Sequence, residues 1–190
     1  MTSIEDDATL IGRCLVGESQ AQRALVERHR PAIWRLARNA TGSAEEAFDI
    51  AQETFVAAFA ALGRYDASRP FGAWLTRIAL NKCRDWSRRR AVRRMFEFAM
   101  PEGLGAAHTD DTPLPDRIAS GRAELAAVSL AIASLPVRLK EVLLLRAVEG
   151  MGQAQTAALL GISEKAVETR LARARVKILD VLRANSAGRV

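Results

Sequence analysis

Seven basic side chains fall within thirteen residues of the segment 82–94, where Asp85 is the single acidic residue. Guanidinium and ammonium groups at this density favour binding to the phosphates of nucleic acid. Aromatic residues precede and interrupt the segment, and rings beside a basic helix suit single strands, whose unpaired bases can stack. Taken singly, Phe71, Trp74 and Trp86 are better explained as core residues. The basic residues are Lys82, Arg84, Arg88, Arg89, Arg90, Arg93 and Arg94.

The segment 135–178 has the pattern of two helices that cross at a tight turn. Ala157, Gly161 and Val167 supply a small residue, a glycine for the turn and a branched apolar residue for the second helix. Ser163 precedes that helix and can accept a hydrogen bond from its first amides. The segment therefore predicts a helix-turn-helix. The apolar stripe of its second helix is Val167, Leu171, Ala174 and Ile178.

The face opposite this stripe is the one expected to enter a major groove. Its alternative explanation is an ordinary solvated face on a helical hairpin. The face carries Lys165, Thr169, Ala172, Arg173 and Val176, with Glu168 and Arg175 on its flanks.

The chain has 190 residues and a net charge of +6, which is unevenly distributed. Residues 1–95 and 121–190 are basic, whereas residues 96–120 hold one base and five acids. We expect two modules joined by a mostly extended acidic linker, because the linker has three prolines and no sustained period. The alternative is a loop packed across a single domain.

Apolar spacing in the first module predicts helices and no strands, so the fold class is all-α: two small helical domains. The second helix is expected to be interrupted or kinked near Pro31. Ser43 should cap the third helix, with Glu46 at the capping-box position, and Gly63 should end it. A fourth helix should begin near Phe71. The predicted apolar stripe of the third helix is Phe48, Ala51, Phe55, Phe59 and Leu62.

Several classes of protein are disfavoured by what the sequence lacks. It has no apolar run approaching eighteen residues, and its acidic start is unlike a signal peptide. Cys14 and Cys83 are far apart, and with His29 and His108 they form no metal-ligand spacing. No nucleophile or phosphate-loop arrangement is present. We therefore expect neither catalysis nor a cofactor nor a metal.

The runs AFDIAQETFVAAFAAL (47–62) and FGAWLTRIALNKCRDWSRR (71–89), followed by the helix-turn-helix, resemble a bacterial extracytoplasmic-function sigma factor of the sigma-70 family. The resemblance covers nearly the whole chain. It implies a region 2 domain in residues 1–95, a linker in 96–120 and a region 4 domain in 121–190. It also implies a transcription-initiation subunit that joins core RNA polymerase and recognises the −10 and −35 promoter elements. Catalysis is left to the core enzyme.

The family's polymerase-docking pattern, D-x-x-Q-E-x-F, corresponds to Asp49, Gln52, Glu53 and Phe55, and Val56 lies beside it. The resemblance implies that this helix binds the clamp helices of the β′ subunit, and that region 4 contacts the β flap. Family members often carry an acidic residue where Phe48 stands, which weakens the correspondence at that position.

The resemblance also assigns the promoter contacts. A flipped base of the downstream element would lie near Asn81, while Tyr65 could either stack on a base or cap the helical bundle. Many relatives carry a basic residue where Glu168 stands; here the carboxylate could accept from a cytosine or pair with Lys165 or Arg175. The downstream set is Arg64, Tyr65, Asp66, Asn81, Lys82, Asp85, Arg88 and Arg89; the upstream set is Arg146, Lys165, Glu168, Thr169, Ala172 and Arg173.

Regulation is expected to come from an anti-sigma factor, and the protein is expected in the cytoplasm. The acidic linker, with Asp110, Asp111 and Asp116, could occupy a channel built for nascent RNA or serve only as a soluble tether. Two other classes are considered. A two-component or quorum-type regulator would need an α/β domain upstream, and an enzyme acting on nucleic acid would need a catalytic arrangement.

Overall fold

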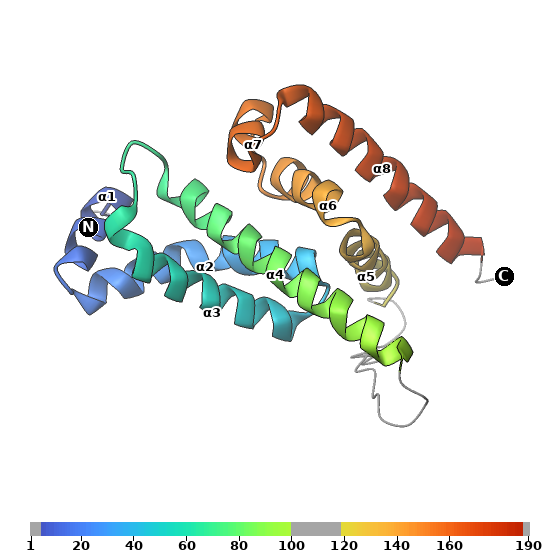
Figure 1. Cartoon of the computed structure of the whole chain (residues 1–190), viewed down its shortest axis with the longest axis horizontal. Coiled ribbons are helices and arrows are strands. Elements are labelled where there is room, and N and C mark those ends of the chain that lie inside the picture. The colour runs from blue at the N-terminus through green and yellow to red at the C-terminus, as the bar shows by residue number, and fades with distance from the viewer. Residues whose placement is uncertain (1–4, 100–118, 188–190) are drawn as a thin grey trace.

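The computed structural model describes residues 5–99 and 119–187, and every regular element within these ranges is helical. This confirms the all-α prediction (Figure 1). The helices follow the order α1 (Asp7–Leu15), α2 (Ser19–Thr41), α3 (Ala44–Ala61), η1 (Leu62–Arg64), α4 (Phe71–Ala99), α5 (Ala119–Ser134), α6 (Val137–Leu143), η2 (Leu144–Val148), α7 (Gln153–Leu160) and α8 (Glu164–Ala187).

Helix α2 continues through Pro31, so the interruption that was one of the two predicted outcomes is absent. A proline inside a helix removes one backbone hydrogen bond and costs about 3 kcal/mol. Apolar residues on both sides of Pro31, among them Leu25, Ile33 and Leu36, continue one buried face against α1, α3 and α4. Burying a single leucine stabilises by about 1.5–3 kcal/mol, so the packed face offsets the lost hydrogen bond.

Helix α3 begins at the predicted cap, where the Ser43 hydroxyl accepts a hydrogen bond from the Glu46 amide at 3.4 Å. The predicted apolar stripe is wrong at Phe48, whose side chain is 52% exposed. The centre of the buried face passes through Ala47, Thr54 and Ala58, all fully buried. At about 100° per residue, Phe48 lies at the edge of that face. The exposed ring therefore belongs to the molecular surface.

Helix α4 begins at Phe71, as predicted. Phe71 and Trp86 are buried, and Trp74 is half-buried. The helix runs to Ala99, beyond the expected start of the linker at residue 96, and α5 already begins at Ala119. Residues 100–118, which include Asp110, Asp111 and Asp116, lie outside the described residues.

The second half of the chain folds into the predicted helix-turn-helix on a supporting helix. Helix α8 packs against α5, α6 and α7 (Figure 1). Val142 of α6, Ala157 of α7 and Val167 of α8 form a small buried cluster where the three helices meet. Gly161 closes α7 with φ of +66°, a conformation that glycine adopts without strain. The Ser163 hydroxyl accepts from the Ala166 amide at 3.1 Å and caps α8, as predicted.

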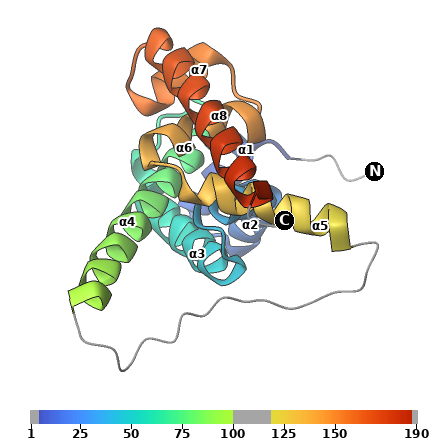
Figure 2. The same cartoon turned by 90° about the vertical axis from the view of Figure 1, so that its right-hand side faces the viewer.

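The two halves contact one another. Helix α5 lies against α2 (Figure 2). The π-helical turn η2 also contacts α2, while α6 and α7 contact α4. One apolar cluster contains residues of both halves, among them Leu36, Leu80 and Leu144. No helix in the described ranges is long and apolar enough to cross a membrane.

Candidate nucleic-acid and partner interfaces

The outward face of α8 has the composition expected of a groove-reading helix. Val167 and Ala174 are buried, which turns the opposite face of the helix toward solvent. The Lys165 ammonium lies 2.9 Å from the Glu168 carboxylate, and the Thr169 hydroxyl donates to the Lys165 carbonyl at 2.9 Å. The exposed residues of this face are Lys165, Glu168, Thr169, Ala172, Arg173, Arg175 and Val176.

Arg146, the remaining residue of the predicted upstream set, lies in η2 and is half-buried. Its guanidinium donates a hydrogen bond to the Met151 carbonyl, in the turn that leads into α7. Its Nε is buried without a hydrogen-bond partner. In this arrangement the Arg146 guanidinium holds the turn that precedes α7.

The basic face of α4 is tied into the structure by ion pairs. The Lys82 ammonium lies 3.2 Å from Glu53 of α3, and Arg88 pairs with Asp85 one turn earlier. The Arg90 guanidinium lies 5.1 Å from the centre of the buried Trp86 ring, which fits a cation–π contact. Arg88, Arg89 and Arg90 are exposed, so this end of the helix presents positive charge to solvent.

Asn81, the residue predicted near a flipped base, is exposed on α4. Its side-chain oxygen accepts a hydrogen bond from Arg84 Nη1 at 3.0 Å. The Arg84 guanidinium also binds both carboxylate oxygens of Glu141 on α6. The hydrogen bonds to Glu141 raise the pKa of Arg84 above its ordinary value.

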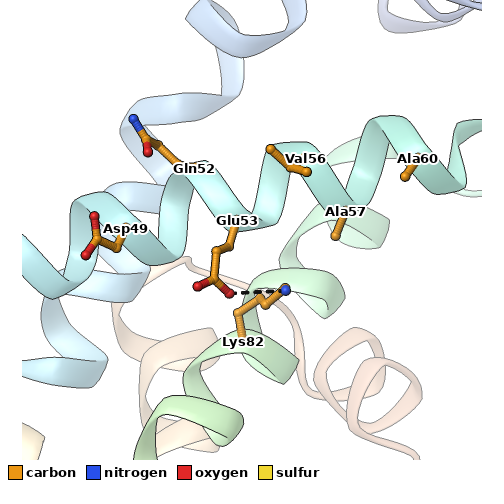
Figure 3. A pocket seen from close by; sticks show the side chains of 7 residues that line it. All are labelled: Asp49, Gln52, Glu53, Val56, Ala57, Ala60 and Lys82. Atoms are coloured by element: carbon orange, nitrogen blue, oxygen red, sulfur yellow. Dashed lines mark ion pairs between the residues drawn. The ribbon is translucent and has the colours of Figure 1, made fainter.

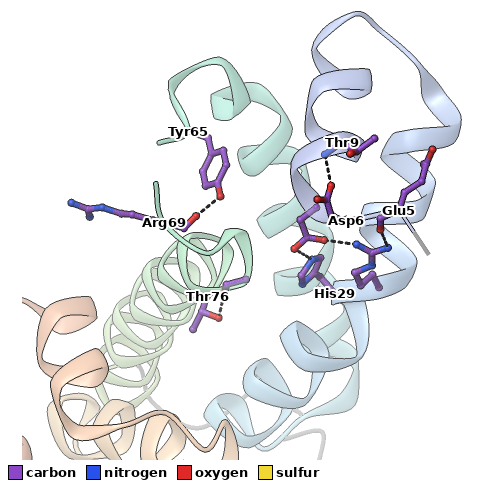
Figure 4. A network of polar contacts seen from close by, with 10 residues as sticks. Glu5, Asp6, Thr9, His29, Tyr65, Arg69 and Thr76 are labelled. Carbon is purple, nitrogen blue, oxygen red and sulfur yellow. Dashed lines mark hydrogen bonds and ion pairs between the residues drawn. The ribbon is translucent and has the colours of Figure 1, made fainter. Parts of the chain in front are cut away.

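Tyr65 caps the bundle, the second of its two predicted roles (Figure 4). Its ring packs at 5.5 Å from Phe71 and 5.2 Å from Trp74, and its hydroxyl donates to the Arg69 carbonyl. Burial raises the pKa of its hydroxyl. The neighbouring Asp66 and Arg64 are exposed, and hydrogen bonds from Ser68 lower the pKa of the Asp66 carboxyl.

A hollow on the outer side of α3 contains the predicted docking residues (Figure 3). Asp49 and Gln52 are exposed, and Val56 is 70% exposed. Carboxylate and amide groups beside an apolar side chain suit a basic helical partner. The apolar spacing of the sequence does not identify Ala57 and Ala60 as part of this surface. Their small side chains leave the hollow open. The lining residues are Asp49, Gln52, Glu53, Val56, Ala57, Ala60 and Lys82.

Residues 25–93 match the family model of Sigma-70 region 2, and residues 125–178 match that of Sigma-70, region 4. The RNA polymerase sigma factor CnrH of Cupriavidus metallidurans is 40% identical over 98% of this chain and 99% of its own. The ECF RNA polymerase sigma factor SigM of Mycobacterium tuberculosis is 33% identical over 93% of this chain and 84% of its own. The chain belongs to the extracytoplasmic-function sigma factors of the sigma-70 family.

A solved structure supports the same conclusion over most of the length of this sigma factor. The structure of CnrH in complex with the cytosolic domain of CnrY is 35% identical, with a TM-score of 0.67. The match covers 95% of this chain and 99% of that one.

The family confirms the resemblance drawn from the motifs and excludes the response-regulator alternative. Every predicted site residue lies inside one of the two matched segments: the docking and downstream sets lie in region 2, and the upstream set lies in region 4.

In the described part of this sigma factor, no three His, Cys, Asp or Glu side chains are grouped so that they could hold a metal ion.

Proposed function

We propose that this sigma factor binds core RNA polymerase through α3, reads the −10 element with α4 and its preceding loop, and reads the −35 element with α8. The observation that carries the proposal is the presence of three solvent-facing surfaces on three different helices. The surface on α3 is acidic and apolar, whereas those on α4 and α8 are basic. Membership of the family also predicts that polymerase binding, −10 recognition and −35 recognition are carried out by these separate surfaces.

Docking through α3 is supported by residues that contribute little to the core. Asp49, Gln52 and Val56 are exposed, so their types are not required for packing. The proposed partner is the pair of β′ clamp helices, whose basic side chains would meet Asp49 and Glu53. Exposed Val56 would lose water on contact and add apolar burial. The β flap is the proposed partner of the region 4 domain.

Reading of the −10 element is supported by the charge and exposure of α4. Arg88 and Arg89 can hold the phosphate backbone, with Asn81 as the hydrogen-bonding group for an extruded base. Extrusion of a base costs a few kcal/mol, which several phosphate contacts can offset. Tyr65 contributes by fixing the loop, since its ring is packed against Phe71 and Trp74.

Reading of the −35 element is assigned to the exposed face of α8. Arg173 is the residue best suited to a bidentate contact with guanine. Thr169 and Ala172 can contact base edges and methyl groups, and Glu168 is held by Lys165. We assign region 2 to residues 1–95, the linker to 96–120 and region 4 to 121–190.

Control by an anti-sigma factor is supported by the related CnrH, which has been solved with the cytosolic domain of CnrY. We place the protein in the cytoplasm with its polymerase and assign it no catalytic step of its own. The regulated genes would be those of a stress or signal response.

Run-off transcription with purified core RNA polymerase tests the proposal. Start sites that depend on this chain should appear on a pool of genomic promoters. They should be lost with Asp49→Ala combined with Gln52→Ala. A matched control is Glu45→Ala, which removes an exposed carboxylate in the first turn of α3, outside the hollow. Specific DNA binding without any polymerase-dependent start would overturn the proposal.

A further inference from the structure

A partly buried ion pair joins the two domains. Arg84 of α4 donates through Nε to one carboxylate oxygen of Glu141 and through Nη2 to the other, the latter at 2.9 Å. The Glu141 side chain is only 8% exposed, whereas that of Arg84 is 39% exposed. The carboxylate is therefore taken out of water by the contact between domains, and Arg84 supplies its compensating charge.

A second buried charge lies next to the first. The Lys140 ammonium of α6 donates to the carbonyl of Ala40 at 2.8 Å and to the carbonyl of Ala133. Ala40 lies in the last turn of α2, where helix carbonyls lack intrahelical partners and favour a cation. Lys140 is 6% exposed overall. Two adjacent residues of α6 thus place an ammonium group against α2 and a carboxylate against α4.

A third polar contact also joins the two domains. Arg35 of α2 lies 3.1 Å from the carboxylate of Glu149, which is 13% exposed. Close backbone contact accompanies these pairs, since a Cβ built on Gly42 would lie 3.1 Å from that of Ala133. The domains meet through matched charges and tight packing.

The interface reaches the proposed DNA-reading surface through Arg84. The same guanidinium that binds Glu141 donates to the side-chain oxygen of Asn81 at 3.0 Å. Asn81 is the proposed base-binding residue of the −10 domain. Its hydrogen-bond acceptor is therefore occupied by an arginine that is held by the −35 domain.

We propose that the free sigma factor is closed by the Arg84–Glu141 pair and that this contact restrains promoter reading until the domains separate. Separation exposes Glu141 to water and frees the Arg84 guanidinium and the Asn81 side-chain oxygen for contacts with DNA. The inhibitory consequence rests on the proposed function, whereas the closure itself does not.

Cys83 provides a reporter for the closed state. Its thiol is buried, and burial raises its pKa to about 12. The charges that act on it are those of Lys140 and Glu141, both on α6. Cys14 is also buried, but it lies on α1, and the charges that act on it are Arg13 and Glu18. Opening of the interface should therefore raise the reactivity of Cys83 and leave that of Cys14 unchanged.

The experiment measures iodoacetamide alkylation of each cysteine in the full chain, by peptide mass spectrometry, without polymerase or DNA. Glu141→Arg should accelerate alkylation of Cys83 by about tenfold or more. A buried thiol reacts only in the fraction of molecules in which the interface is open, and the substitution raises that fraction. The double exchange Arg84→Glu with Glu141→Arg should restore the slow rate. Glu141→Gln, which keeps the shape of the side chain, should give an intermediate rate.

The matched control is Asp180→Arg, the same reversal at an exposed acid of α8. It should react like the parent chain. Small-angle scattering should show a larger radius of gyration for Glu141→Arg and recovery in the double exchange. Unchanged Cys83 reactivity in Glu141→Arg would overturn the proposal, as would an equal rise at Cys14. Either result is independent of the transcription assay, so failure of closure and failure of the proposed function are distinguishable.

Discussion

Replacement of Gly161 by alanine is expected to destabilise the chain, whereas the same replacement at Gly12 is expected to stabilise it. Gly161 closes α7 in the left-handed region, with φ of +66° and ψ of 40°. Gly12 lies inside α1 and is exposed. A Cβ built at either position meets nothing within 4 Å. Backbone conformation is therefore the main difference between the two sites.

The magnitudes follow from that difference. An L-residue in the left-handed region costs about 1–2 kcal/mol, and the reduced entropy of the unfolded chain returns about 0.4–1 kcal/mol. Gly161→Ala should therefore lower the unfolding free energy by roughly 1 kcal/mol. Gly12→Ala should raise it by about 0.8–1 kcal/mol, the difference in helix propensity. The two variants should differ by about 2 kcal/mol.

Urea unfolding measures both variants. The tryptophans Trp34, Trp74 and Trp86 all precede the linker, so their fluorescence reports the region 2 domain, and circular dichroism reports both domains. With an m-value of about 2 kcal/mol/M, each midpoint should shift by roughly 0.5 M, in opposite directions. Gly161→Asn should recover part of the loss, because asparagine tolerates this conformation. Shifts of the same sign would refute the reasoning.

Three further predictions concern binding and pH. Arg173→Ala should cost about 1–3 kcal/mol in promoter affinity measured by fluorescence anisotropy, whereas Arg183→Ala, farther along α8, should cost little. An equal loss on unrelated DNA would make Arg173 a phosphate contact. Val56→Asp should abolish polymerase binding in a pull-down and leave thermal stability unchanged, since the side chain is 70% exposed; a lowered melting temperature would contradict this. Because the pKa of the Cys83 thiol is raised from 9.0 to about 12, the unfolded chain loses that proton first, and stability should fall by about 1.4 kcal/mol per pH unit between these values. Cys83→Ala should flatten that slope in urea titrations at pH 8 to 10.5.

The helices and the helix-turn-helix could be predicted because their signals are local. Ser43 and Ser163 cap the helices that follow them, and Gly161 adopts the left-handed conformation expected at the turn. Each of these features depends on the backbone within four residues. The predicted faces of α8 were also correct, since one periodic stripe determines both the buried and the exposed side.

Predictions that depended on more distant partners were less complete. Phe48 fits an apolar period yet lies at the edge of the packed face, and Pro31 is accommodated because three helices cover α2. Local sequence does not reveal which face a neighbouring helix will cover.

Contacts between the domains were decided by tertiary structure alone. Arg84 and Glu141 are 57 residues apart, and Lys140 and Ala40 are 100 apart, so no local pattern joins them. Sequence alone would place charged residues of α6 in water. They are buried because α4 and the end of α2 supply an opposite charge and carbonyl acceptors, and only the packed domains bring these groups within hydrogen-bonding distance.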